Sequence, residues 1–197
     1  MSGTITNIGT SIVKIPELYE NLSDANVAPH TAGSNVNTKI TASEWDNIKK
    51  ADNYTISVLS TEMTGLGEIL IKQTNRAVEQ SICMMGMEFS SEKKVVINGY
   101  LYDLTEANGT YTATNTGSQS TSTLDDLIGA ITFADLKYDE TNRCYTYSAE
   151  SDVVGYFYFE NGHLVKFVKV SGETKNVVFL YNVGTTAIEI PQYTVAK

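Results

Sequence analysis

The sequence has few of the residues that form cross-links, metal sites and catalytic centres. Among its 197 residues are two cysteines, two histidines and three prolines. Cys83 and Cys144 are far apart in the chain and have no histidine nearby, so the ligand spacings of zinc sites are absent. In an oxidising compartment the two cysteines could form a disulfide, but buried strand cysteines are also common as small apolar side chains. Both alternatives stay open from the sequence, and we expect no metal and no cofactor.

The scarcity of histidine leaves few candidates for a general base. His30 lies in a polar segment and His163 follows a predicted turn, so we expect both to be solvated rather than catalytic. The nucleophile-elbow, dinucleotide-binding, phosphate-binding and zinc-protease motifs are all absent. Acidic pairs at 125–126 and 139–140 fall at a predicted helix start and in a predicted turn, where the helix dipole and turn chemistry explain them. These observations predict a protein that is not an enzyme.

Positive charge is scarce as well. Lys and Arg number 14 against 23 Asp and Glu, which gives a net charge of −9. This field repels phosphate backbones and anionic membranes, so nucleic acid is not an expected partner. No stretch reaches the roughly 18–20 apolar residues of a transmembrane helix, and no signal-peptide pattern follows Met1. With 42% hydrophobic and 19% charged residues, the chain is predicted to be globular.

One short motif occurs twice in the chain. Residues 7–17 match residues 182–192 at an offset of 182 − 7 = 175 residues, with Asn, Gly, Thr, Ile and Pro identical at five positions. We interpret residues 1–19 as the closing strand of a preceding copy of the same domain. The alternative is that two edge strands independently use a glycine turn, alternating apolar residues and a terminal proline.

The residues that follow predict a linker and then one domain. Residues 20–39 are mostly small and polar without a sustained apolar period, which is typical of a linker. The domain is predicted to cover residues 40–194.

A short helix that begins at a capping box after Ile40 and runs to about Ala51 is predicted at the start of this domain. Thr41 and Glu44 have the spacing of a capping box, and Ile40 and Trp45 are placed to form a hydrophobic staple around it. Trp45 and Ile48, three residues apart, give the helix one apolar face.

Most of the remaining chain is predicted to form strands joined by tight turns. We expect strands over 53–60, 67–73, 76–90, 95–97, 100–102, 153–159 and 176–181. Turns are expected at the Asn-Gly pairs 98–99, 108–109 and 161–162, and at 139–142 and 172–173. Short connections of this kind predict an antiparallel meander rather than parallel βαβ units.

The meander is interrupted once. Residues 115–122 are predicted to form a polar loop that leads into a helix over 123–131. This helix is amphipathic, because Leu124, Leu127, Ile128 and Ile131 recur at a spacing of three to four. Its apolar stripe is expected to cover one face of the sheet.

Strands 153–159 and 176–181 are apolar or aromatic on both alternating faces, unlike a strand with one face in water. They are either ordinary central strands of a thick core or part of a curved sheet that lines an apolar cavity. Nearby methionines would suit an irregular ligand, although methionine is equally an ordinary gap filler.

The order of these features resembles a known family. The leading helix with Trp45, the meander, the mid-chain helix and the closing segments 159–165 and 181–191 resemble lipoprotein-type domains of Gram-positive and gut bacteria with the LolA/LppX-like fold, over residues 40–194. The resemblance implies an α+β fold in which a strongly curved antiparallel sheet, a half-barrel, has short helices on its concave face. It also implies an extracytoplasmic, cell-envelope protein that carries lipids or lipoproteins, with the signal region missing from this chain.

These expectations lead to two hypotheses for function. The first is a non-enzymatic cell-envelope module that binds a hydrophobic ligand, such as a lipid, an acyl chain or a lipidated peptide, between sheet and helices. The second is a structural or protein-interaction repeat module of a multi-domain exported protein, with a protein partner in the cell envelope and no ligand. For the first hypothesis, the apolar pattern predicts a pocket lined by Trp45, Ile48, Met63, Met85, Met87, Leu124, Leu127, Ile128, Tyr156, Tyr158 and Phe179.

Overall fold

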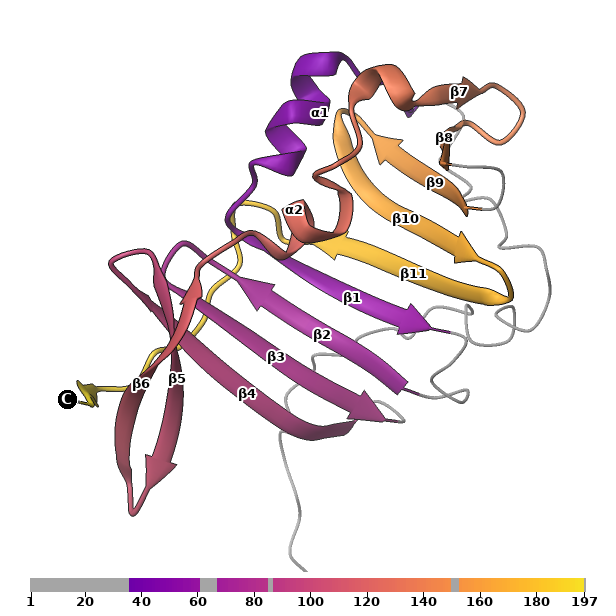
Figure 1. Cartoon of the computed structure of the whole chain (residues 1–197). Helices are drawn as coiled ribbons and strands as arrows, with labels where there is room; N and C mark the ends of the chain where they lie inside the picture. Colours follow the sequence, from indigo (N-terminus) through magenta and orange to yellow (C-terminus); the bar gives the residue numbers. More distant parts are fainter. Residues whose placement is uncertain (1–35, 61–66, 85–86, 150–152, 197) are drawn as a thin grey trace, which may run out of the picture.

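The computed structural model describes residues 36–60, 67–84, 87–149 and 153–196 (Figure 1). The helical elements are α1 (Ala42–Lys49), α2 (Thr123–Ile128) and the 3-10 turn η2 (Phe133–Asp135). The strands are β1 (Tyr54–Ser60), β2 (Gly67–Gln73), β3 (Ala77–Met84), β4 (Met87–Ile97), β5 (Tyr100–Ala107), β6 (Thr110–Gln119), β7 (Lys137–Asp139), β8 (Cys144–Ala149), β9 (Val153–Glu160), β10 (His163–Ser171), β11 (Thr174–Tyr181) and β12 (Tyr193–Val195). The predicted preceding copy at 1–19, most of the predicted linker, and Met63 and Met85 lie outside the described residues.

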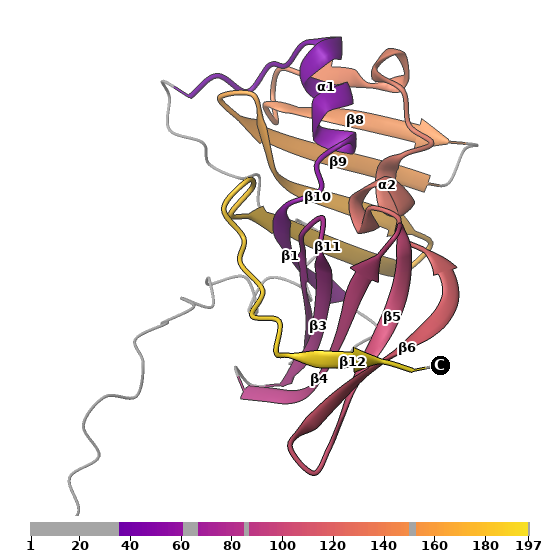
Figure 2. The same cartoon turned by 90° about the vertical axis from the view of Figure 1, so that its left-hand side faces the viewer.

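The described strands form one sheet in the order β12-β6-β5-β4-β3-β2-β1-β11-β10-β9-β8-β7. Two antiparallel meanders, β1 to β6 and β7 to β11, meet where β1 pairs with β11. The predicted single antiparallel meander is therefore only partly right, and β12 moreover pairs in parallel with β6. The sheet is not closed, since β12 and β7 are its two ends, and it twists strongly between its halves (Figure 2).

The local turn signals are confirmed. Asn98, Asn108 and Asn161 have positive φ angles of 52°, 52° and 50°, and each is followed by a glycine with positive φ. Only residues that tolerate left-handed backbone suit both central positions of such two-residue hairpin loops. Each Asn-Gly pair therefore connects two neighbouring antiparallel strands, as predicted.

Two predicted segments, the strand over 76–90 and the loop over 115–122, are wrong. The single strand expected over 76–90 is two strands, β3 and β4, whose paired ends are Met84 and Met87. The loop expected over 115–122 is largely the end of β6, which continues to Gln119. Its polar residues still pair with β5 beyond the short stretch that pairs with β12, because a strand needs ladder partners for its backbone but no apolar side chains.

Helix α1 begins at the predicted capping box. The Thr41 side chain accepts from the Glu44 amide at 3.3 Å, and Glu44 accepts from the Thr41 amide at 2.7 Å. This backbone hydrogen bond holds the pKa of the Glu44 carboxyl below its ordinary value. Trp45 follows in the first turn and is fully buried, with its indole N–H donating to the Ile131 carbonyl at 3.0 Å.

Helix α2 is shorter than the predicted 123–131. It ends at Ile128, and Gly129 is its C-cap. The Ile131 carbonyl accepts hydrogen bonds from the Trp45 and Lys49 side chains of α1. The residues beyond the cap therefore contact α1 instead of extending α2. Both helices lie over one face of the β9, β10, β11 and β1 region (Figures 1 and 2). We call this face the helix face and the opposite one the back face.

The core has two parts, one on each side of the sheet. On the helix face, Trp45 makes edge-on contacts with Phe157 and Phe159, at centroid distances of 5.4 and 6.3 Å. On the back face, a smaller cluster comprises Leu59, Cys144, Tyr158, Val168 and Val177. Cys144 is thus a buried thiol, and Cys83 on β3 is free as well, so the disulfide alternative is wrong.

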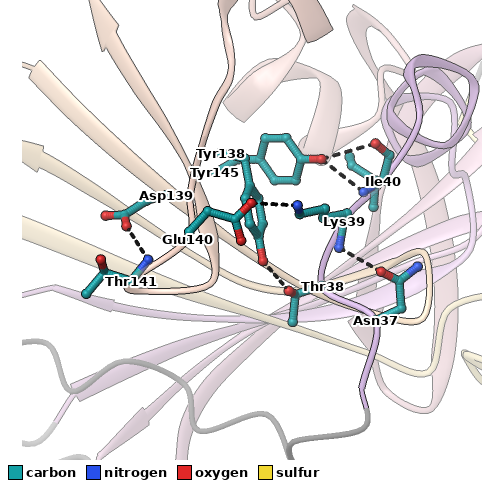
Figure 3. A network of polar contacts seen from close by, with 9 residues as sticks. All are labelled: Asn37, Thr38, Lys39, Ile40, Tyr138, Asp139, Glu140, Thr141 and Tyr145. Carbon is teal, nitrogen blue, oxygen red and sulfur yellow. Dashed lines mark hydrogen bonds and ion pairs between the residues drawn. The ribbon is translucent and has the colours of Figure 1, made fainter.

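The chain ahead of α1 is attached to the β7–β8 hairpin (Figure 3). Lys39 pairs with Glu140 at 2.6 Å and Thr38 hydrogen-bonds Tyr138. The Tyr145 hydroxyl accepts from the Ile40 amide at 3.0 Å and donates to its carbonyl at 3.1 Å. These contacts fix the start of α1 over the sheet, so the last residues of the predicted linker are part of the folded unit.

Candidate functional site

An apolar row crosses six consecutive strands on the helix face. Its members are paired directly across the ladder from β9 to β3, in the order Phe157, Phe167, Val178, Val58, Ile69 and Ile82. Residues paired in this way project from the same face. The row therefore joins the packed half of the sheet to its other half in one continuous strip.

Exposure changes along this row. Phe157, Phe167 and Val178 are at most 3% exposed beneath the helices, Val58 and Ile69 are half-buried, and Ile82 is 37% exposed. Met84 and Met87, paired at the end of β3 and β4, are 49% and 70% exposed. The apolar strip thus runs out from the core to an open rim. We call Val58, Ile69, Ile82, Met84 and Met87 the open apolar surface.

Helix α2 is fastened to the strands beside this surface. The Tyr54 hydroxyl accepts from the Leu124 amide at 2.8 Å, and the Gln73 side-chain oxygen accepts from the Thr123 amide at 2.9 Å. The Tyr54 hydroxyl also donates to that Gln73 oxygen at 2.8 Å. Two residues of β1 and β2 thereby satisfy first-turn amides that a helix cannot satisfy itself.

The predicted pocket residues do not lie together. Trp45, Leu124 and Ile128 are almost completely buried between helices and sheet, and Ile48 packs against the same cluster. Leu127 projects outward from α2 and is 38% exposed, which makes the buried stripe of that helix narrower than predicted.

Strand alternation places three further predicted residues on the other side of the sheet. Tyr156, Tyr158 and Phe179 belong to the back-face cluster, because their neighbours Phe157 and Val178 face the helices. Together with Met87 at the rim, the predicted residues are divided among three places. The pattern of apolar residues on both faces was visible in the sequence, but the side that the helices cover was not.

A buried lysine lies within the back-face cluster. Lys166 is 3% exposed, and its ammonium lies 4.1 Å from the centre of the Tyr158 ring. Burial lowers the pKa of Lys166 to about 8 and raises the pKa of Cys144 to about 11. Both shifts arise because burial disfavours the charged form.

The back face also has a polar groove of about 770 Å³ between β4 to β6 and residues 182–192. Several of its charged side chains have partners: Lys94 pairs with Asp103 at 3.4 Å, and Glu106 accepts from Tyr111 at 2.9 Å. This groove suits an apolar ligand less well than the open apolar surface does.

Within 36–60, 67–84, 87–149 and 153–196, no group of three His, Cys, Asp or Glu side chains is placed to hold a metal ion. In the same ranges, no helix has the length and apolar content needed to cross a bilayer.

Comparison with known proteins gives structural neighbours only. No family model and no curated protein matches the sequence. The crystal structure of LprF from Mycobacterium bovis is similar with a TM-score of 0.45 and 11% identity, covering 77% of this chain and 93% of that chain. The lipoprotein LppX from Mycobacterium tuberculosis is similar with a TM-score of 0.37 and 10% identity, covering 74% and 93%. We transfer no residue role from either protein.

Proposed function

We propose that this protein is a non-enzymatic, extracytoplasmic module of the cell envelope that holds a hydrophobic ligand on the helix face of its sheet. The ligand class is a lipid, an acyl chain or a lipidated peptide. The observation that supports the proposal is the apolar row, which continues from the core past α2 to exposed Ile82. A row that served the core alone would be expected to turn polar where the helices end.

The chemistry of the open apolar surface supports the same ligand class. Its five aliphatic or thioether side chains come from neighbouring strands, and they leave water without requiring a hydrogen-bond partner. Met84 and Met87 are flexible and adapt to irregular chains. Exposed apolar side chains that are contiguous in space are typical of interaction sites, whereas isolated ones are common on any surface.

Helix α2 forms the border of the proposed site. Its six residues are too few for a helix that is stable alone, so its position depends on Leu124, Ile128 and the bonds from β1 and β2. In this proposal Leu127, exposed on the same helix, contacts the bound ligand. The more deeply buried predicted residues, Trp45, Ile48 and Ile128, lie in the core that holds α2 against the sheet.

Lipid retention and probe binding test the proposal together. The purified protein is extracted with organic solvent for mass spectrometry, and it is also titrated with a fluorescent fatty acid. We expect Ile82→Asp to weaken probe binding by about tenfold or more, because a carboxylate is costly to bury against an acyl chain. Val195→Asp is the matched control, since Val195 is 49% exposed on β12, which ends the sheet outside the open apolar surface.

The alternative is a structural or protein-interaction repeat module with a protein partner and no ligand. It is favoured by the complete burial of Trp45 and Leu124, which fill the space under the helices, and by the repeated motif at 7–17 and 182–192. Absence of both retained lipid and probe binding would reject the ligand proposal in favour of this alternative.

A further inference from the structure

Residues 182–192, which we call the strap, cross the back face from the end of β11 toward β12. Three hydrogen bonds attach the strap to Asn53, just before β1. The Gly184 amide donates to the Asn53 carbonyl at 2.8 Å, the Thr186 amide donates to the Asn53 side-chain oxygen at 2.8 Å, and the Asn53 side-chain amide donates to the Thr186 carbonyl at 3.1 Å. The Thr186 hydroxyl lies 2.9 Å from that of Thr55. Thr186 is therefore the anchor of the strap.

The strap begins with a tight turn of defined geometry. Asn182 and Gly184 have positive φ angles of 51° and 77°. The Asn182 carbonyl accepts from the Thr185 amide at 2.9 Å and from the Thr186 hydroxyl at 3.1 Å. Asparagine and glycine tolerate left-handed backbone better than other residues, so this turn restricts which residues can occupy these positions.

The residue types on which the turn and the hydrogen bonds of the strap depend are retained in residues 7–17. Asn7 and Gly9 correspond to Asn182 and Gly184, the two residues with positive φ. Ser11 corresponds to Thr186 and keeps the hydroxyl. Thr10, Ile15 and Pro16 are identical to their counterparts at 185, 190 and 191.

The least similar pairs fall where the strap side chains are exposed. Ile12 replaces Ala187, and Lys14 replaces Glu189, and both strap positions are exposed. The contact of Glu189 with Lys93 uses its backbone carbonyl, at 2.7 Å from the ammonium, so a different side chain leaves that bond in place. The substitutions in 7–17 therefore follow the structural requirements of a strap.

We infer that residues 7–17 are the strap segment of a second domain with this same fold, joined in tandem. The partner surface offers an asparagine amide and a hydroxyl at the places of Asn53 and Thr55, and a lysine at the place of Lys93. Residues 182–192 already occupy the strap site of the present domain. We therefore assign residues 7–17 to another domain. This inference does not depend on the hydrophobic ligand proposed above.

A strap exchange within the full chain tests the inference. In the exchange variant, Val183→Ile, Thr186→Ser, Ala187→Ile, Ile188→Val, Glu189→Lys and Gln192→Glu convert the strap into the sequence of residues 7–17. The control variant carries those eleven residues in a shuffled order that moves the asparagine and the glycine. We expect the exchange variant to melt within about 3 °C of the unmodified protein, and the control more than about 8 °C below it.

Two further measurements keep the test decisive. A second exchange variant retains Glu189 and so avoids placing another lysine beside Lys93. If both exchange variants melt as low as the shuffled control, the inference is wrong. Deletion of residues 1–19 should leave the melting temperature unchanged. A lower melting temperature after this deletion would mean that the segment packs on its own domain, which would also overturn the inference.

Discussion

Strands β8 to β11 carry apolar side chains on both faces, whereas the back faces of β2 to β4 carry charges that pair with one another. In the first region, Phe157 and Tyr158 are successive residues of β9, on opposite faces, and both are almost fully buried. In the second region, Glu79 of β3 lies between Lys72 and Lys93, with Lys93 at 3.1 Å. Burial alone would raise the pKa of Glu79, but hydrogen bonds and ion pairs from the two lysines keep it below its ordinary value.

The difference indicates that the two regions of the sheet are stabilised by different interactions. Burial of apolar surface stabilises the β8–β11 region, while ladder hydrogen bonds, surface ion pairs and the strap hold the β2–β6 region together. Exposed ion pairs contribute little, with a median of about 0–1 kcal/mol. We therefore expect the first region to carry most of the unfolding free energy. The proposed ligand surface lies at the border between the two regions.

Removal of the buried indole should give the largest effect. Trp45→Ala deletes a side chain that is 0% exposed, together with its hydrogen bond to Ile131. We expect a loss of about 3–5 kcal/mol in the free energy of unfolding, measured by urea titration, because the cavity adds to the lost transfer energy. Tyr193→Ala, at a site 36% exposed on β12, is the control. Equal losses in the two variants would contradict the comparison of the two regions.

Two leucines of α2 allow a buried position to be compared with an exposed position on the same helix. Leu124 is 0% exposed and Leu127 is 38% exposed. We expect Leu124→Ala to cost about 2–5 kcal/mol and Leu127→Ala less than about 1 kcal/mol. Leu127→Ala should instead weaken binding of the fluorescent fatty acid. If Leu127→Ala proves as destabilising as Leu124→Ala, α2 is packed on both sides and cannot border an open site.

Substitution of Thr186, the anchor of the strap, should have an intermediate effect on the free energy of unfolding. Thr186→Val removes the hydroxyl that bonds Thr55 and the Asn182 carbonyl while keeping the shape of the side chain. We expect a loss of about 1–3 kcal/mol, because the buried Thr55 hydroxyl loses its partner. Thr186→Ser keeps the hydroxyl and should stay close to the unmodified protein in thermal unfolding. Similar destabilisation by both variants would show that the methyl group, not the hydroxyl, anchors the strap.

The smallest effect concerns the pH dependence of the back-face cluster. Because burial lowers the pKa of Lys166 to about 8 from its ordinary value of 10.5, the folded protein loses this proton more readily than the unfolded chain. The destabilisation by Lys166 is thus full below pH 8 and is relieved as the pH rises from about 8. The raised pKa of Cys144 acts in the opposite direction above pH 9, since the folded state keeps that thiol protonated.

A lysine-to-methionine variant isolates this effect. We expect Lys166→Met to be more stable than the unmodified protein at pH 7, and the difference between the two unfolding free energies to shrink between pH 8 and 10. Because Lys166 and the Cys144 thiol interact, urea titrations of both proteins in a Cys144→Ala background measure the difference at each pH. A difference that stays constant with pH would show that Lys166 titrates normally in the folded protein.

Features set by neighbouring residues could be predicted from the sequence. Thr41 and Glu44 form their capping box, and the three Asn-Gly turns join the expected strands, because each depends on backbone geometry within a few residues. The strand at 67–73 has the predicted bounds, since a short apolar run between glycine and polar residues leaves little freedom. The amphipathic pattern of α2 also predicted the burial of Leu124 and Ile128.

Features that depend on distant pairing were decided by the tertiary structure. The pairing of β1 with β11, and the parallel pairing of β12 with β6, join segments whose sequences carry no mark of their partner. Strand alternation placed Phe157 and Tyr158 on opposite faces, but only the folded chain determined that Trp45 covers Phe157. The proposed site therefore depends on where the helices stop along the sheet, because the same kind of apolar residue is core beneath a helix and exposed surface beyond it.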